Sequence, residues 1–205
     1  GNNRNIVVSD QSGRSNIMSR LRTIGIEISE NDPKIKKLLE EVKDREFIGY
    51  SYDGADASFE LLARRIIAEI PRYISIKEYD VSVTKNDSDK IVSKAKAKLE
   101  VDGEKIVCEG EGNGPVNALD NAIRNNVDKL EKYADYLKDL KLVDYKVRIL
   151  NTGTEAVTRV SIESTDSKGK NWFTIGVSPN IIEASFRALI DLSLIHISEP
   201  TRQDR

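Results

Sequence analysis

The sequence is poor in the side chains that usually build catalytic and metal sites. Its 205 residues include one cysteine, one histidine, one tryptophan and one methionine. A lone cysteine, Cys108, excludes an internal disulfide and fits a reducing compartment. Cys108 lies in a strand-like stretch, where we expect a buried and inert thiol. With so little histidine, we expect no histidine-based metal site and no Ser-His or Cys-His couple.

Two further absences limit the possible partners. No apolar run approaches the roughly 20 residues of a membrane-spanning helix, and no signal peptide opens the chain. The formal net charge is −2, so no basic field favours nucleic acid or an anionic membrane. We therefore expect a cytoplasmic chain with neither kind of partner. The start at Gly1, without an initiator methionine, is what we expect of a piece of a longer protein.

The rest of the composition is ordinary for a folded globular protein, with 39% hydrophobic and 32% charged residues. The pattern predicts an α+β fold. A small helical linker module, residues 1–71, precedes an antiparallel-sheet domain, residues 72–191. In the linker we expect a short strand at residues 6–8 and then a helix that ends near Gly25. The candidate N-caps of this helix are Ser12, Ser15 and Asn16.

The other two linker helices have clearer signals. Asp32 precedes Pro33, which suits the first position of a helix, and an apolar stripe at helical spacing follows. The stripe comprises Ile35, Leu38, Leu39 and Val42. A third helix is expected over residues 54–69, with Asp53 as its cap and Pro71 just beyond its end.

After residue 72 the hydrophobic pattern changes from the helical period to a period of two. Apolar and polar residues alternate over residues 79–84 and again over residues 94–101, which predicts two half-buried strands. Asp102-Gly103 is a strong hairpin signal, and a third strand is expected to end near Glu109. The outer face of the second strand would carry Lys94, Lys96 and Lys98.

The chain is organised around the stretch Gly-Glu-Gly-Asn-Gly-Pro-Val-Asn-Ala-Leu, residues 110–119, which joins a strand to a helix. Its glycines allow a sharp turn and positive φ, and Pro115 suits the first helical position. The N–H groups of the first turn, near Val116 and Asn117, point outward with the positive end of the helix dipole behind them. That arrangement suits a small anion such as a carboxylate.

The same pattern recurs at an offset of 176 − 110 = 66 residues, where residues 176–189 align with residues 110–123 without a gap. A pair of alternating strands precedes each copy. We therefore infer a duplicated β-β-β-α module, over residues 72–140 and 141–191. The first helix is expected to extend, or to be followed by another, through Tyr133 and Tyr136. The second helix is expected to begin at Pro179.

The last stretch, residues 192–205, breaks the helical pattern, and Pro200 forbids a simple continuation. Its run Ile-His-Ile-Ser-Glu-Pro-Thr-Arg resembles a translated vector read-through. We expect a non-native tail here, and we discount its histidine, His196, as a functional residue.

Three motifs, at their spacings, resemble the C-terminal allosteric domain of 2-isopropylmalate synthases and citramalate synthases. They are Gly112-Asn-Gly-Pro115, Val143-Asp-Tyr145 and Ser178-Pro179. Upstream, residues 12–17 (Ser-Gly-Arg-Ser-Asn-Ile) and 56–61 (Asp-Ala-Ser-Phe-Glu-Leu) resemble the helical linker of the same enzymes. The likeness is closer to the citramalate synthase branch and covers about residues 1–191.

The resemblance implies a full-length acyltransferase whose metal-dependent N-terminal barrel condenses acetyl-CoA with a 2-oxo acid. This chain lacks the barrel. Divalent metal and acetyl-CoA are therefore expected only there, and no catalytic residue, metal or cofactor is expected in this chain. In such enzymes the C-terminal domain binds the end-product amino acid, leucine or isoleucine, at a homodimer interface and inhibits the barrel.

The residues themselves fit a branched-chain amino acid. Its carboxylate would lie at the helix N-terminus, and the side chain of Asn117 or a backbone carbonyl would accept hydrogen bonds from its ammonium. The resemblance adds an apolar wall. The effector-binding residues that we expect are Gly112, Asn113, Gly114, Val116, Asn117, Leu142, Tyr145, Ile149, Pro179 and Ile181. These residues do not distinguish leucine from isoleucine, and only the branch resemblance favours isoleucine.

Two other functions stay open at this point. Residues 92–130 also resemble a double-stranded-RNA-binding domain, which places basic residues at the start of its last helix. Here that position reads Asn-Gly-Pro-Val-Asn-Ala, residues 113–118, without a lysine. The other possibility is a dimerisation module without a ligand.

Overall fold

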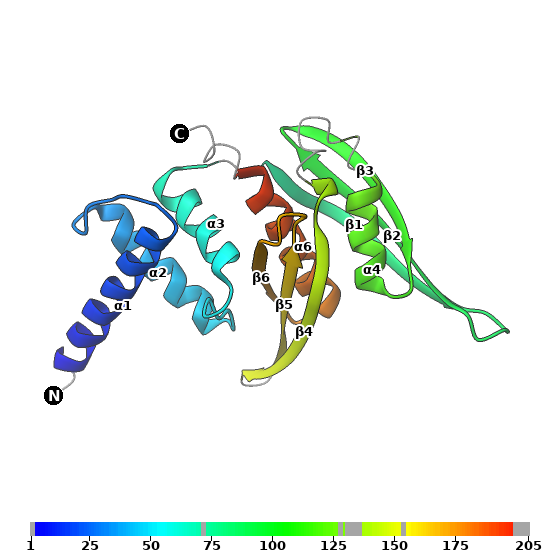
Figure 1. Cartoon of the computed structure of the whole chain (residues 1–205). Helices are drawn as coiled ribbons and strands as arrows, with labels where there is room; N and C mark the ends of the chain where they lie inside the picture. Colours follow the sequence, from blue (N-terminus) through cyan, green and yellow to red (C-terminus); the bar gives the residue numbers. More distant parts are fainter. Residues whose placement is uncertain (1–2, 71–72, 127–128, 130–136, 153–154, 199–205) are drawn as a thin grey trace.

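The computed structural model describes residues 3–70, 73–126, 129, 137–152 and 155–198 (Figure 1). The helical linker comes first and comprises α1 (Asn3–Thr23), α2 (Pro33–Phe47) and α3 (Asp56–Ile67). A first set of elements follows, with β1 (Ile74–Lys85), β2 (Ile91–Val101), β3 (Glu104–Gly112) and α4 (Pro115–Asn125). The second set comprises β4 (Lys141–Thr152), β5 (Glu155–Thr165), β6 (Asn171–Ser178) and α6 (Ile181–Ser198). The predicted α+β class is confirmed, because the linker helices precede two three-stranded antiparallel sheets, each followed by a helix.

The beginning of the chain differs from the expectation. Residues 6–8 belong to α1 and not to a strand, and the candidate caps Ser12, Ser15 and Asn16 lie inside that helix. A short apolar run favours a strand only weakly unless a neighbouring strand pairs with it. In the described chain the two sheets are formed by β1 to β6 alone. Among residues 13–23 of α1, the buried side chains are Ile17, Met18 and Leu21.

The caps of the other two linker helices give one confirmation and one correction. The Asp32 side chain caps α2 by accepting the Lys34 N–H at 2.9 Å, with proline in the first turn as predicted. Helix α3 begins at Asp56 with Ala55 at its cap position, so Asp53 is not its cap. Between them Gly54 has a φ of 76°, a left-handed turn that separates Asp53 from the helix.

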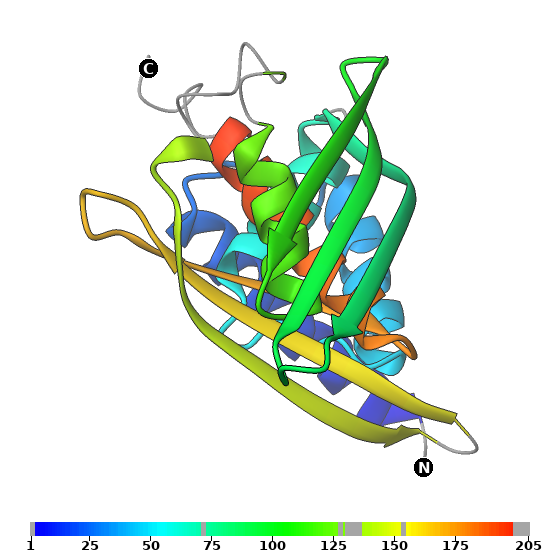
Figure 2. The ribbon, with the colours of Figure 1, turned by 90° about the vertical axis from the view of Figure 1, so that its right-hand side faces the viewer.

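The two sheets have the strand orders β1-β2-β3 and β4-β5-β6, with antiparallel neighbours throughout. Helix α4 packs on β2 and β3, whereas α6 packs on β5 and β6 and also contacts α3, α4 and β1. Figure 1 shows α6 between the linker and the first sheet, and Figure 2 shows the strands of the two sheets running in different directions. Helix α6 therefore contacts the linker and both sets of β-β-β-α elements.

The two β-β-β-α sets repeat each other in detail. Both first strands carry a β-bulge, between Ile76 and Glu78 in β1 and between Leu142 and Asp144 in β4. The offset between the bulges is 142 − 76 = 66 residues, the same as the offset found in the sequence. A bulge inserts one residue and re-aims the strand beyond it, so this agreement supports the inferred duplication.

Each helix lies very close to the last strand of its own repeat. A Cβ added to Gly110 would lie 2.6 Å from the carbonyl oxygen of Ala118 and would overlap the backbone of Ala122. A Cβ added to Gly176 would lie 2.9 Å from the carbonyl carbon of Ala184, and it would overlap the backbone there. Real Cβ atoms do not approach backbone this closely, so only glycine permits this helix–strand distance.

The linker docks on the second repeat through polar contacts and a shared apolar core. The Ser58 hydroxyl of α3 accepts the Ile175 N–H of edge strand β6 at 3.0 Å and donates to Asp191 Oδ2 at 2.9 Å. Arg159 Nε of β5 donates to the Gly49 carbonyl at 2.6 Å. The Ile175 side chain, 2% exposed, packs inside the hydrophobic cluster of the linker. An otherwise open sheet edge is thereby covered.

The end of the described chain also differs from the expectation. Helix α6 continues to Ser198, so the expected break in the helical pattern at residue 192 is wrong. Its last turns find apolar neighbours, and His196 lies edge-on to Trp172 with ring centroids 4.5 Å apart. Burial lowers the pKa of His196 to about 4, so the imidazole is neutral near pH 7. The non-native origin of residues 192–205 stays a prediction, and the expected helix through Tyr133 and Tyr136 lies outside the described residues.

Helix–strand contact at the two glycines yields a stability prediction. Gly110→Ala and Gly176→Ala are each expected to lower the free energy of unfolding by about 2 kcal/mol or more, because the new methyl group pushes the helix off its sheet. The matched control is Gly114→Ala, where an added Cβ meets nothing within 4 Å and φ is −156°. Its expected cost is about 1 kcal/mol or less. Urea unfolding measures all three, and equal losses would contradict the expectation.

Candidate functional site

The turn between β3 and α4 brings together the first half of the expected effector residues. Helix α4 has Gly114 at its cap position, in an extended conformation with φ −156° and ψ 167°, and no side chain caps the helix there. The glycines allow positive φ, but Gly110, Gly112 and Gly114 do not use it, since they are not among the positive-φ residues. Their role is close approach: a Cβ on Gly112 would lie 2.7 Å from the backbone nitrogen of Ala118.

Asn117 folds back over this turn. Its Oδ1 accepts the Asn113 N–H at 3.2 Å, which holds the amide side chain against Gly112. A carbonyl oxygen has two lone pairs, so Oδ1 keeps one acceptor position. The cap residue of α4 is Gly114, so no side chain at the cap position accepts a hydrogen bond from the first-turn N–H groups of Val116 and Asn117. The turn therefore offers donors and an acceptor a few atoms apart, which is what a zwitterion requires.

Ser93 of β2 is a candidate that the sequence patterns did not reveal. It pairs with Gly112 in the sheet register, so the two residues face the same side, beneath the first turn of α4. Ser93 is fully buried, and its hydroxyl has no hydrogen-bond partner within the described residues. A buried hydroxyl without a partner is costly. The alternation in β2 predicts only that Ser93 faces inward. No sequence signal marks Ser93 as a functional residue.

The second half of the expected residues lies on edge strand β4. Tyr145 and Ile149 face the same side as the buried residues of β5, and so does Leu142 before the bulge. Ile149 is 69% exposed and Leu142 is 37% exposed, although they lie on the apolar face of the sheet. Val147, between Tyr145 and Ile149 on that face, is 40% exposed and was not among the expected residues. The described helices leave this end of the face largely exposed.

The start of α6 lies beside β4 and holds the remaining expected residues. Helix α6 begins at Ile181, two residues after Pro179, because Asn180 caps it by accepting the Ile182 N–H at 2.8 Å. The Tyr145 hydroxyl lies 2.9 Å from the Ser185 hydroxyl, which donates to the Ile181 carbonyl at 2.6 Å. Pro179 and Ile181 are both exposed, as expected for a wall that faces a ligand or a partner.

The structure thus divides the expected site between the two repeats. Residues 112–117 belong to the first repeat, and Leu142, Tyr145, Ile149, Pro179 and Ile181 belong to the second. Val116 and Tyr145 both pack against the same hydrophobic core, which extends through both repeats. The elements on which α4 chiefly packs are β3, β2, α6 and β1. Strand β4 is therefore not among the elements on which α4 chiefly packs.

The described residues offer little for covalent or metal chemistry. They contain no group of three His, Cys, Asp or Glu side chains placed to hold a metal ion. Cys108 is buried, and desolvation raises the pKa of its thiol, which agrees with the inert role expected for it. None of the described helices combines the length and the apolar character needed to cross a membrane.

The lysines of β2 bear on the RNA-binding alternative. Lys94, Lys96 and Lys98 project from the outer face of the first sheet, as expected. Each pairs with a carboxylate across the sheet, at 3.0 Å for Glu111, 2.8 Å for Glu109 and 2.6 Å for Glu78. Pairs of opposite charge on neighbouring strands stabilise a sheet. Because each of these three lysines is paired with a carboxylate, they do not form a basic stripe for phosphates.

Comparison with known proteins identifies the family of this chain. The family model described as "LeuA allosteric (dimerisation) domain" matches residues 53–193. An (R)-citramalate synthase of Aquifex aeolicus is 45% identical over 194 residues, and one of Geobacter sulfurreducens is 43% identical over 194 residues. A probable 2-isopropylmalate synthase of Methanopyrus kandleri is 26% identical over 192 residues.

These three alignments cover 93% of this chain but only 36% of each relative, so the chain spans about a third of the length of the curated relatives that it matches. The match over residues 53–193 includes α3, both sheets, α4 and most of α6, and all the candidate site residues lie within it. The chain therefore belongs to the LeuA allosteric (dimerisation) domain family, with greater similarity to the (R)-citramalate synthases than to the 2-isopropylmalate synthase compared here.

Proposed function

We propose that this chain is the feedback-regulatory region of an acetyl-CoA-dependent enzyme that condenses a 2-oxo acid, of the citramalate synthase kind. It binds isoleucine or leucine between two copies of itself. The catalytic barrel, with its divalent metal and acetyl-CoA, belongs to the part of the protein outside this chain. The observation that carries the proposal is the uncapped first turn of α4 lying over the buried, unpartnered Ser93 hydroxyl.

The polar end of the amino acid fits that turn. The ligand carboxylate accepts the N–H groups of Val116 and Asn117, where the helix dipole also favours negative charge. The ammonium donates to Asn117 Oδ1, which retains a lone pair beside its bond to the Asn113 N–H. The Ser93 hydroxyl below supplies one further donor or acceptor. Asn117 is neutral, so the ammonium is held without an opposite charge.

The apolar end needs the second repeat, and a partner copy supplies it. Leu142, Tyr145 and Ile149 form an apolar strip on edge strand β4 that is largely exposed in the single chain. In a two-fold dimer the same patch is used twice, so each turn of one copy can face the strip of the other. Two ligands then lie in the interface, and each stabilises the dimer by mass action.

Isoleucine is favoured over leucine by the greater similarity to the (R)-citramalate synthases. The two amino acids differ in the position of one methyl group, a difference worth about 1–3 kcal/mol in a shaped apolar pocket. Inhibition also requires a second arrangement of the domains. The contacts of α3 with α6 and β6 support a role for the linker in that change.

Calorimetric titration of the chain with L-isoleucine, then L-leucine, tests the binding proposal. Saturable heat is expected with one of them. Tyr145→Ala is expected to weaken it at least tenfold by removing the aromatic wall, whereas Tyr145→Phe, which keeps the ring and loses only the Ser185 contact, should stay within about threefold. Saturable binding that is equal in Tyr145→Ala and the parent would place the ligand elsewhere. A folded dimer that gives no heat with either amino acid supports the module without a ligand.

Sedimentation velocity tests the proposed interface. Ile149→Lys places a charge in the apolar strip of β4 and is expected to weaken the dimer at least tenfold, because the ammonium must be desolvated. The matched control is Val107→Lys, an exposed valine on the outer face of the first sheet, which should leave dimerisation unchanged. If Val107→Lys alone dissociated the dimer, the interface would lie on the other face of the molecule.

A further inference from the structure

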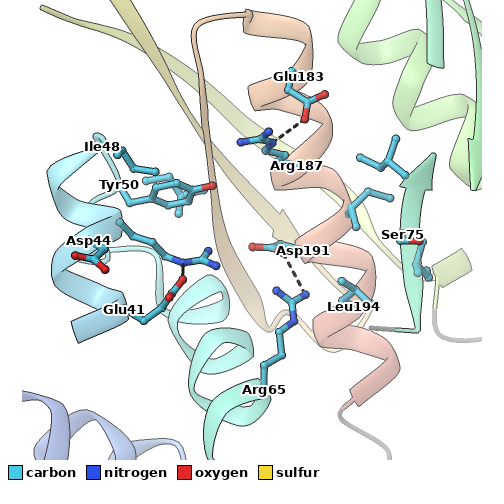
Figure 3. Close-up of a pocket in the computed structure, with 15 residues that line it drawn as sticks. Glu41, Asp44, Ile48, Tyr50, Arg65, Ser75, Glu183, Arg187, Asp191 and Leu194 are labelled. Atoms are coloured by element: carbon cyan, nitrogen blue, oxygen red, sulfur yellow. Dashed lines mark hydrogen bonds and ion pairs between the residues drawn. The ribbon is translucent and has the colours of Figure 1, made fainter. Parts of the chain in front are cut away.

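A cleft of about 600 Å³ separates the linker from α6 and β1, and it contains none of the expected effector residues (Figure 3). Its walls come from α2 and the loop after it, from α3, from the first residues of β1 and from one face of α6. A volume of this size accommodates a small metabolite.

One side of the cleft is apolar. Ile74 and Ile76 of β1 and Ile190 and Leu194 of α6 line it. Ile76 is only partly buried, although it packs against the main hydrophobic core. Aliphatic surface of this kind suits a branched side chain rather than a phosphate or a sugar.

The other sides carry charged residues, and two pairs of an arginine with an acid lie next to the apolar wall. Arg187 Nε lies 2.7 Å from Glu183 Oε1, and Figure 3 shows this pair above the cleft on α6. Arg65 of α3 forms an ion pair with Asp191 of α6, with the nitrogen and oxygen 3.7 Å apart. Positive and negative groups thus line the cleft beside its apolar wall.

The duplication relates this cleft to the proposed effector site. With the 66-residue offset, Ile76 corresponds to Leu142 and Glu183 corresponds to Asn117. Both counterparts are expected effector residues, and both Ile76 and Glu183 line the cleft. Tyr79, the counterpart of Tyr145, lies edge-on to Phe186 of α6, with ring centroids 5.3 Å apart. The first strand of one repeat therefore meets the start of the other repeat's helix here, within a single chain.

We propose that this cleft is a second binding site for an α-amino acid with an aliphatic side chain. Arg65 supplies donors for the carboxylate, Glu183 accepts from the ammonium, and the side chain lies on Ile76 and Ile190. The correspondence with Asn117 rests on the proposed function, whereas the charges and the apolar wall are independent of it. Glu183 is charged where Asn117 is neutral, so this site holds an ammonium more strongly.

Occupancy of the cleft would bear directly on the linker. Arg65 and Ser58 both belong to α3, and Asp191 accepts from the Ser58 hydroxyl at 2.9 Å. A ligand held between Arg65 and Glu183 joins α3 to α6 through additional ionic contacts. The second site therefore fixes the linker against the regulatory repeats, whereas the first site joins two copies of the chain.

Binding stoichiometry tests the second site. Equilibrium dialysis and calorimetry of the full chain with L-isoleucine and with L-leucine are expected to give two bound molecules per chain. Glu183→Gln and, separately, Arg65→Gln are each expected to reduce this number to one. The matched control is Glu111→Gln, which removes an exposed carboxylate paired with Lys94 on the outer face of the first sheet and should leave two. Thermal unfolding of each variant establishes that it is folded, and two different cleft variants guard against failure of one to fold.

The outcomes separate this proposal from the previous one. One molecule per chain, lost in Tyr145→Ala and unchanged in Glu183→Gln and Arg65→Gln, overturns the second site and leaves the interface site. One molecule per chain, lost in the two cleft variants and unchanged in Tyr145→Ala, supports the cleft and overturns the interface site. No saturable binding by the folded parent chain overturns both.

Discussion

The structure depends on how closely each helix approaches the last strand of its repeat. At Gly110 and Gly176 the helix backbone occupies the space of a side chain, and alanines at 118, 122, 184 and 188 supply the facing surface. This contact fixes the height of α4 and α6 above their sheets, and with it the position of each first turn. The first turn of each helix lies only a few residues from its glycine contact. The packing of helix on strand therefore sets the orientation of the N–H groups in that turn. The glycines therefore matter because they permit this close approach of helix and strand, and not because they adopt positive φ.

Duplication gives the domain two similar halves, and the chain uses them differently. The second repeat carries the linker, because Ser58 covers the free edge of β6 and Arg159 reaches the Gly49 carbonyl. The first repeat has an exposed outer face of paired lysines and carboxylates. Between them, α6 contacts both sheets and α3. Any ligand or partner that shifts α6 therefore acts on the linker.

Much of this arrangement could be predicted from the sequence, because it depends on local patterns. Alternation and the Asp102-Gly103 hairpin signal located the strands of the first repeat, Asp32 and Pro33 located α2, and the 66-residue offset located the second repeat. The errors have tertiary causes. Residues 6–8 are helical because no strand of the described sheets pairs with them, and α6 continues past residue 191 because its last turns find apolar neighbours. Ser93 and the charged cleft could not be predicted, since both arise from elements distant in the sequence.

The most direct test is a crystal structure of the chain grown with saturating L-isoleucine. Density for the amino acid is expected at the first turn of α4, with its carboxylate on the N–H groups of Val116 and Asn117. Its side chain is expected to lie against the apolar strip of β4 in the partner copy. A well-ordered dimer with that turn empty, or with the α4 turn and the β4 strip far apart across the interface, would contradict the proposed site.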